Sequence, residues 1–121
     1  MFERLSGSFG ENLGFKIMDG VTGEDVHQIG QIMAETIAKF GKIRVLIEIV
    51  GFRHMQLEVL IEKVNFAREH ATDIERMAVL SDRVWIKSWV KVGGLLALGT
   101  HTEVEHFDRS EFEAAWEWLA R

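Results

Sequence analysis

The segment 43–50 has the most distinctive hydrophobic pattern in the chain. It reads Ile-Arg-Val-Leu-Ile-Glu-Ile-Val, and β-branched and aliphatic side chains dominate it. Segments with helical spacing of apolar residues precede and follow it. Buried parallel strands alternate with helices in this way. The segment is therefore predicted to be the central strand of an α/β sheet.

The other apolar residues predict the elements on either side of this strand. Runs at 2–9 and 13–18, separated by the turn Gly10-Glu11-Asn12, predict a hairpin, so the first strand is an antiparallel edge. Helical spacing of apolar residues predicts helices that begin near residues 22, 56, 82 and 110. The segments 77–81 and 103–107 are predicted to be further strands. The order is β-β-α-β-α-β-α-β-α, in a single domain over residues 1–121.

Cap residues support two of the predicted helices. Thr22 and Asp25 resemble a capping box at the start of the first helix, and Gly41 suits its C-terminal end. Ser110 and Glu113 have the S-x-x-E spacing of a capping box, which predicts that the last helix begins at Ser110.

The layers follow from chain order and side-chain alternation. Crossovers between parallel strands are right-handed, so strands laid down in sequence gather their helices on one face. Ile43, Val45 and the alternate residues after them would face those helices, whereas Arg44 and Glu48 would face away. We expect helices mainly on one face of a five-stranded mixed sheet. The other, half-polar face would be partly solvated or lie in a homodimer.

Composition and charge narrow the function. The 121 residues include no cysteine, which excludes disulfides and cysteine-ligated metals. The net charge is −5 without a basic cluster, which argues against a nucleic-acid partner. No apolar run approaches the roughly 18 residues of a membrane span, and the N-terminus lacks a signal-peptide pattern. We expect a cytoplasmic protein.

The carboxyl ends of the strands form the expected contact surface, because ligands of open parallel sheets bind there. Ser81, Asp108 and Arg109 belong to this edge. The predicted ligand or partner rim combines apolar and charged residues: Phe52, Arg53, His54, Met55, Asp82, Arg83 and Trp85. The alternative is that these residues are ordinary caps and surface loops.

Catalytic and metal signatures are missing from the sequence. The five histidines form no H-E-x-x-H pair, and there is no G-x-S-x-G elbow or P-loop. We therefore expect no catalytic residues, no metal and no cofactor. His54 is the only histidine on the predicted rim, and a surface role is favoured over that of a general base.

Several segments resemble the small bacterial SpoIIAA-like proteins, whose fold is related to STAS anti-anti-sigma domains and to lipid-binding Sec14 (CRAL-TRIO) domains. The resemblance covers nearly the whole chain, and its matching segments are 22–26, 41–48, 75–82 with Trp85 and Trp89, 103–108 and 114–119. It implies a STAS/Sec14-like β-α superhelix with a sheet backed by helices.

Two functions are implied by this resemblance. STAS domains are switched by phosphorylation of a Ser or Thr at the start of the helix after the third strand, but segment 51–56 has no hydroxyl residue. Sec14 domains hold a lipid, but they are much larger. A chain of 121 residues has room for a shallow groove at most. We expect a non-enzymatic binding or regulatory module with a protein partner, and a small amphiphile as the alternative ligand. That alternative includes weak hydrolytic chemistry at His54.

Overall fold

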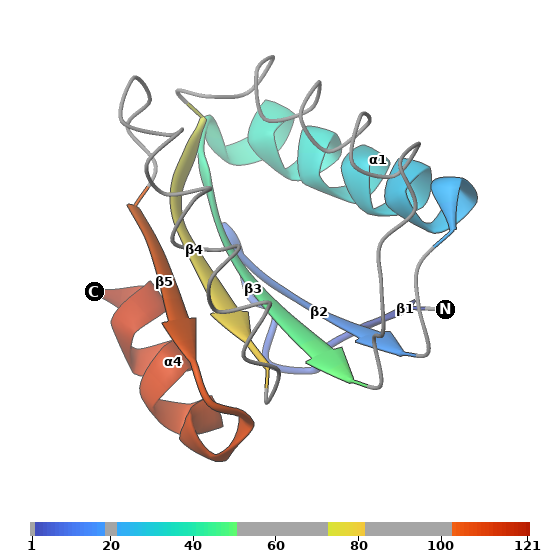
Figure 1. The fold of residues 1–121 in the computed structure, drawn as a ribbon. Coiled ribbons are helices and arrows are strands. Elements are labelled where there is room, and N and C mark those ends of the chain that lie inside the picture. Colours follow the sequence, from blue (N-terminus) through green and yellow to red (C-terminus); the bar gives the residue numbers. More distant parts are fainter. Residues whose placement is uncertain (1, 19–21, 51–72, 82–102) are drawn as a thin grey trace.

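The computed structural model describes residues 2–18, 22–50, 73–81 and 103–121 (Figure 1). Its strands form one sheet in the order β1-β2-β3-β4-β5, with β1 antiparallel to β2 and the others parallel. The bounds are β1 Phe2–Arg4, β2 Asn12–Met18, β3 Ile43–Val50, β4 Ile74–Leu80 and β5 Glu103–Phe107. The predicted mixed sheet is confirmed, with its antiparallel N-terminal edge strand and segment 43–50 at its centre.

The N-terminal hairpin has a shorter first strand than the predicted 2–9. After Arg4 the chain turns twice, with Ser8 N–H donating to Leu5 O (3.0 Å) and Phe9 pairing with Asn12. The Ser8 hydroxyl also accepts a hydrogen bond from Gly14 N–H at 2.9 Å. This side-chain bond replaces strand pairing and ends β1 early.

Helix α1 (Gly23–Phe40) begins and ends as its cap residues predict. Thr22 Oγ1 accepts from Asp25 N–H at 3.0 Å, and Thr22 N–H donates to the Asp25 carboxylate at 3.1 Å. Gly41 has φ +83° and donates its N–H to Ile37 O at 2.7 Å. A left-handed residue of this kind is the usual glycine end of a helix. Within the described ranges, no helix is long and apolar enough to cross a membrane.

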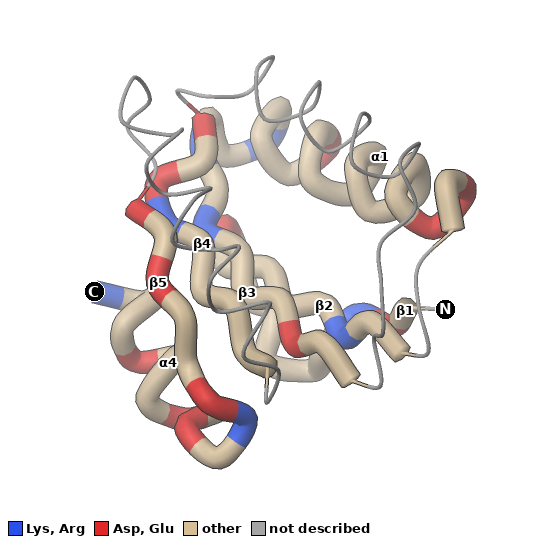
Figure 2. Tube along the Cα trace, in the orientation of Figure 1, with Lys and Arg blue, Asp and Glu red and all other residues tan. Residues whose placement is uncertain are grey.

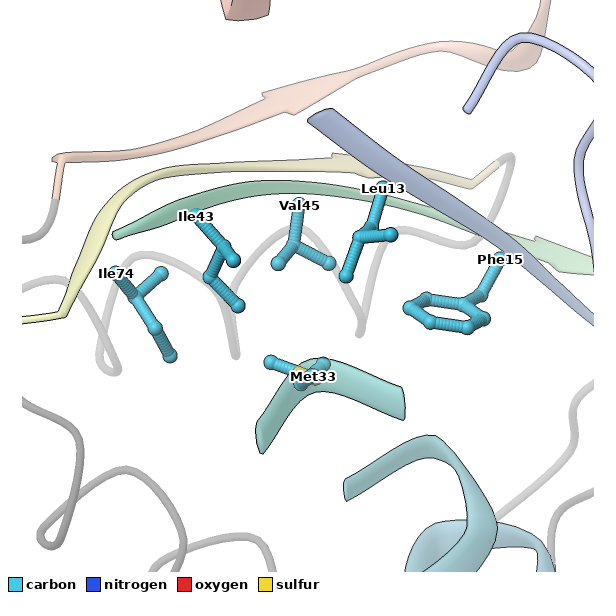
Figure 3. Close-up of a cluster of buried hydrophobic side chains, with 6 residues drawn as sticks. All are labelled: Leu13, Phe15, Met33, Ile43, Val45 and Ile74. Atoms are coloured by element: carbon cyan, nitrogen blue, oxygen red, sulfur yellow. The ribbon is translucent and has the colours of Figure 1, made fainter. Parts of the chain in front are cut away.

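A first apolar cluster joins α1 to the sheet (Figure 3). Met33 lies on α1 and points toward the sheet, where the other buried side chains come from three adjacent strands. The buried members of this first cluster are Leu13, Phe15, Met33, Ile43, Val45 and Ile74. Four of them, Leu13, Phe15, Ile43 and Val45, are odd-numbered residues of β2 and β3, so the predicted alternation is confirmed on this face.

The opposite face of the sheet is covered by α4 (Phe112–Ala120), which follows the short 3₁₀ helix η2 (Arg109–Glu111) (Figure 1). A second apolar cluster joins them, with Leu46, Ala78, Leu80, Ala115 and Leu119 buried. We expected this face to be partly solvated or to lie in a homodimer, but over β3 and β4 it packs against α4. A possible homodimer stays a prediction.

The reason for this placement is topological. The handedness rule constrains helices that connect two parallel strands. Helix α1 is such a connection, between β2 and β3, and it lies on the expected face. Helix α4 follows β5 and does not connect two of the described strands, so the rule does not fix its side. The helices predicted to begin near residues 56 and 82 lie outside the described residues.

Polar residues on the second face bind α4. Arg44 Nη1 donates to Leu119 O at 2.8 Å, and Arg76 Nη1 donates to Trp118 O at 2.7 Å. The Arg76 guanidinium also lies 5.4 Å from the centre of the Trp118 ring. The last carbonyls of a helix lack intrahelical partners and carry partial negative charge, so cations suit this end.

The start of α4 differs from its prediction. Ser110 lies inside η2, and the reciprocal end contacts belong to Asp108 and Glu111 instead. Asp108 N–H donates to Glu111 Oε1 at 3.0 Å, and Glu111 N–H donates to Asp108 O at 2.8 Å. The predicted pair, Ser110 and Glu113, and the observed pair, Asp108 and Glu111, have the same three-residue spacing. The tight turn directly after β5 selects the earlier pair.

Candidate functional site

The carboxyl ends of β2, β3, β4 and β5 meet at one edge of the sheet, because these strands are parallel. Their last residues are Met18, Val50, Leu80 and Phe107. This is the edge at which ligands of open α/β sheets bind. Two polar pairs lie near it in the described part of the chain.

Ser81 and His106 form the first pair. Ser81 follows β4 directly and is fully buried, and its Oγ lies 3.3 Å from Nε2 of His106 on β5. Ser81 N–H also donates to Phe107 O at 3.1 Å, which continues the β4–β5 pairing past the end of β4. Either histidine tautomer satisfies the contact, since a hydroxyl both donates and accepts. The buried hydroxyl is thus held by its neighbouring strand.

Glu48 and Arg109 form the second pair. Arg109 Nε donates to Glu48 Oε2 at 3.4 Å, joining the first residue of η2 to the central strand. The Glu48 side chain is 11% exposed, whereas that of Arg109 is 37% exposed. Lys16 of β2 is the register neighbour of Glu48. A nearly buried carboxylate therefore sits beside two cationic residues, as its burial requires.

The two pairs lie on opposite faces of the sheet. His106 is paired in register with Val79, and Glu48 with the next residue, Leu80. Successive residues of a strand point to opposite faces, so the His106 imidazole and the Glu48 carboxylate do not converge. A catalytic site needs its groups within hydrogen-bond reach of one reacting atom, so the two pairs do not belong to one such site. Among the residues that the structure describes, no three His, Asp or Glu side chains lie close enough together to hold a metal ion.

The C-terminal part of the chain, from β5 through α4, is acidic (Figure 2). Residues 103–121 contain six carboxylates and two arginines, so they account for most of the net charge of −5. All six carboxylate residues are exposed: Glu103, Glu105, Asp108, Glu111, Glu113 and Glu117. A negative field of this kind repels phosphates and attracts basic surfaces.

The residues predicted for the rim fall into two groups. The structure places Ser81, Asp108 and Arg109 at the carboxyl edge, as expected. The seven residues of the predicted ligand or partner rim, from Phe52 to Met55 and at Asp82, Arg83 and Trp85, lie outside the described residues. Sequence reasoning missed Glu48 and His106 as members of the edge. The signal that could have identified them is that each is a polar residue near the carboxyl end of a predicted strand.

Comparison with known proteins identifies the family. A family model of SpoIIAA-like proteins matches residues 12–120. The chain belongs to the SpoIIAA-like family. This SpoIIAA-like chain also shares its fold with the crystal structure of an uncharacterized protein from the DUF3478 family, with a SpoIIAA-like fold, from Shewanella loihica PV-4.

That likeness shows the fold alone. The TM-score is 0.72 at 20% sequence identity, over 98% of this chain and 90% of the other. No curated protein matches this SpoIIAA-like chain. The resemblance inferred from the sequence is therefore confirmed for family and fold.

Proposed function

We propose that this SpoIIAA-like chain is a non-enzymatic binding or regulatory module that contacts a protein partner at the carboxyl edge of its sheet. The observation that carries this proposal is the pairing of the edge residues. Ser81 with His106, and Glu48 with Arg109, bind each other on opposite faces of the sheet. Polar groups paired in this way hold neighbouring elements together at the edge, and the two pairs do not combine into one catalytic site.

The proposed contact surface continues into the segments that follow the strands. Residues Phe52–Met55 come just after β3, and residues 82–85 come just after Ser81. They include Phe, Trp, Met and two Arg, which are residue types enriched at protein interfaces. The neighbouring carboxylates argue against a nucleic acid as the partner. A STAS-type phosphorylation switch is not part of the proposal, because segment 51–56 has no hydroxyl residue.

Charge reversal tests this surface. The test variant carries Arg53→Glu and Arg83→Glu, and the matched control carries Arg4→Glu and Lys39→Glu, at exposed residues of β1 and α1. Both variants change the net charge equally. Each protein is immobilised, exposed to lysate of the native host, and the captured proteins are quantified by mass spectrometry. We expect at least one protein that binds wild type and control but not the test variant.

Equal capture by all three proteins would contradict a partner at this edge. Circular dichroism of each variant checks that the fold is retained, so that lost binding is not lost structure.

A small amphiphile between the sheet and α1 is the second candidate. It is favoured by apolar side chains that pack on the first cluster yet are only partly buried, among them Ile29, Ile32, Ile37 and Ile47. Partly exposed apolar surface of this kind suits an acyl chain. Titration with laurate, followed by isoleucine methyl NMR signals, should shift these four residues. Unchanged methyl signals, together with intact-protein mass spectra free of bound molecules, would exclude this candidate.

A further inference from the structure

We draw no further inference here: the strongest candidate, the patch of exposed carboxylates on β5 and α4 (Figure 2), is a cluster of like charges, and no second observation in the described part of the chain indicates what binds it.

Discussion

The indole of Trp116 on α4 lies directly against the backbone of Gly14 on β2. A β-carbon at position 14 would lie 2.7 Å from Trp116 Cζ2 and 2.8 Å from Cη2. The same ring covers Gly7, where a β-carbon would lie 3.0 Å from Cζ2. Glycine is needed at Gly14 for this close approach. The contact extends the packing of α4 beyond β3 and β4 to the N-terminal hairpin.

Substitution of Gly14 by alanine should therefore destabilise the protein. The new methyl group overlaps two atoms of a rigid ring and also lies 3.1 Å from Leu5 Cβ. Overpacking of this kind costs about 1–3 kcal/mol. Urea denaturation should show a lower midpoint for Gly14→Ala with an unchanged slope.

A double variant separates this contact from general effects on the strand. Trp116→Phe removes the overlapping ring atoms, so Gly14→Ala should cost less in that background. We expect a coupling free energy of about 1 kcal/mol or more. Additive effects of the two substitutions would show that Trp116 does not limit the size of residue 14.

The arginines that bind the C-terminal end of α4 should contribute to stability. Arg44→Met and Arg76→Met each remove a charged donor from a helix carbonyl. Hydrogen bonds to charged groups contribute about 1.5–3 kcal/mol, and we expect losses in this range. In these variants, amide hydrogen exchange should accelerate more in the last turn of α4 than in other regions.

Lys42→Met is the matched control. Lys42 precedes β3 and pairs with Glu75 at 2.9 Å, and its side chain is half exposed, whereas the carbonyl contacts on α4 are made by Arg44 and Arg76. Its removal should lower stability less than either arginine variant, since exposed pairs contribute little. Arginine variants as stable as Lys42→Met would argue against a stabilising role of the carbonyl contacts.

Local sequence signals predicted much of the fold. The apolar run at 43–50 identified the central strand, and the Thr22–Asp25 spacing identified the start of α1. Both signals act between near neighbours, where alternation and capping chemistry depend on few residues. The carboxyl edge followed from parallel topology, so Ser81 and Arg109 were expected there.

Contacts between distant residues explain what the sequence did not reveal. Arg44 and Glu48 suggested a solvated face, but they bind Leu119 and Arg109, which lie 75 and 61 residues further along the chain. A polar residue that pairs with a helix cannot be distinguished by pattern from one that faces water. The position of α4 had no crossover rule to fix it, and the close contact of Trp116 with Gly14 gives no periodic signal.

The ion pair between Glu48 and Arg109 should be asymmetric in its contribution to stability. Arg109→Met leaves a nearly buried carboxylate without its η2 partner, whereas Glu48→Gln leaves an arginine that reaches water. A buried charge that has lost a partner is the larger penalty. We expect a loss of about 1–3 kcal/mol for Arg109→Met and a smaller loss for Glu48→Gln.

Combining the two substitutions tests the cause. Glu48→Gln in the Arg109→Met background removes the stranded charge, and it should recover part of the lost stability in urea denaturation. Glu105→Gln, at an exposed carboxylate of β5, should recover none. If adding Glu48→Gln destabilises Arg109→Met further, buried charge is not the source of the penalty.

Glu75 should make stability depend on acid pH. The hydrogen bond from Lys42 lowers the pKa of the Glu75 carboxyl below its ordinary value, with Arg44 and Arg76 adding to the effect. A lowered pKa in the folded state stabilises the protein above the pKa of the unfolded chain, and this stabilisation is lost as pH falls through the folded value. Wild type should therefore exceed Glu75→Gln in free energy of unfolding at pH 7, and the difference should be smaller at about pH 3. Urea denaturation at both pH values measures this difference in free energy of unfolding. In a Lys42→Met background the difference should be smaller at pH 7, because the main cause of the lowered pKa of Glu75 is gone. A difference that stays constant from pH 7 to pH 3 would mean that the ionised Glu75 carboxylate contributes nothing to stability.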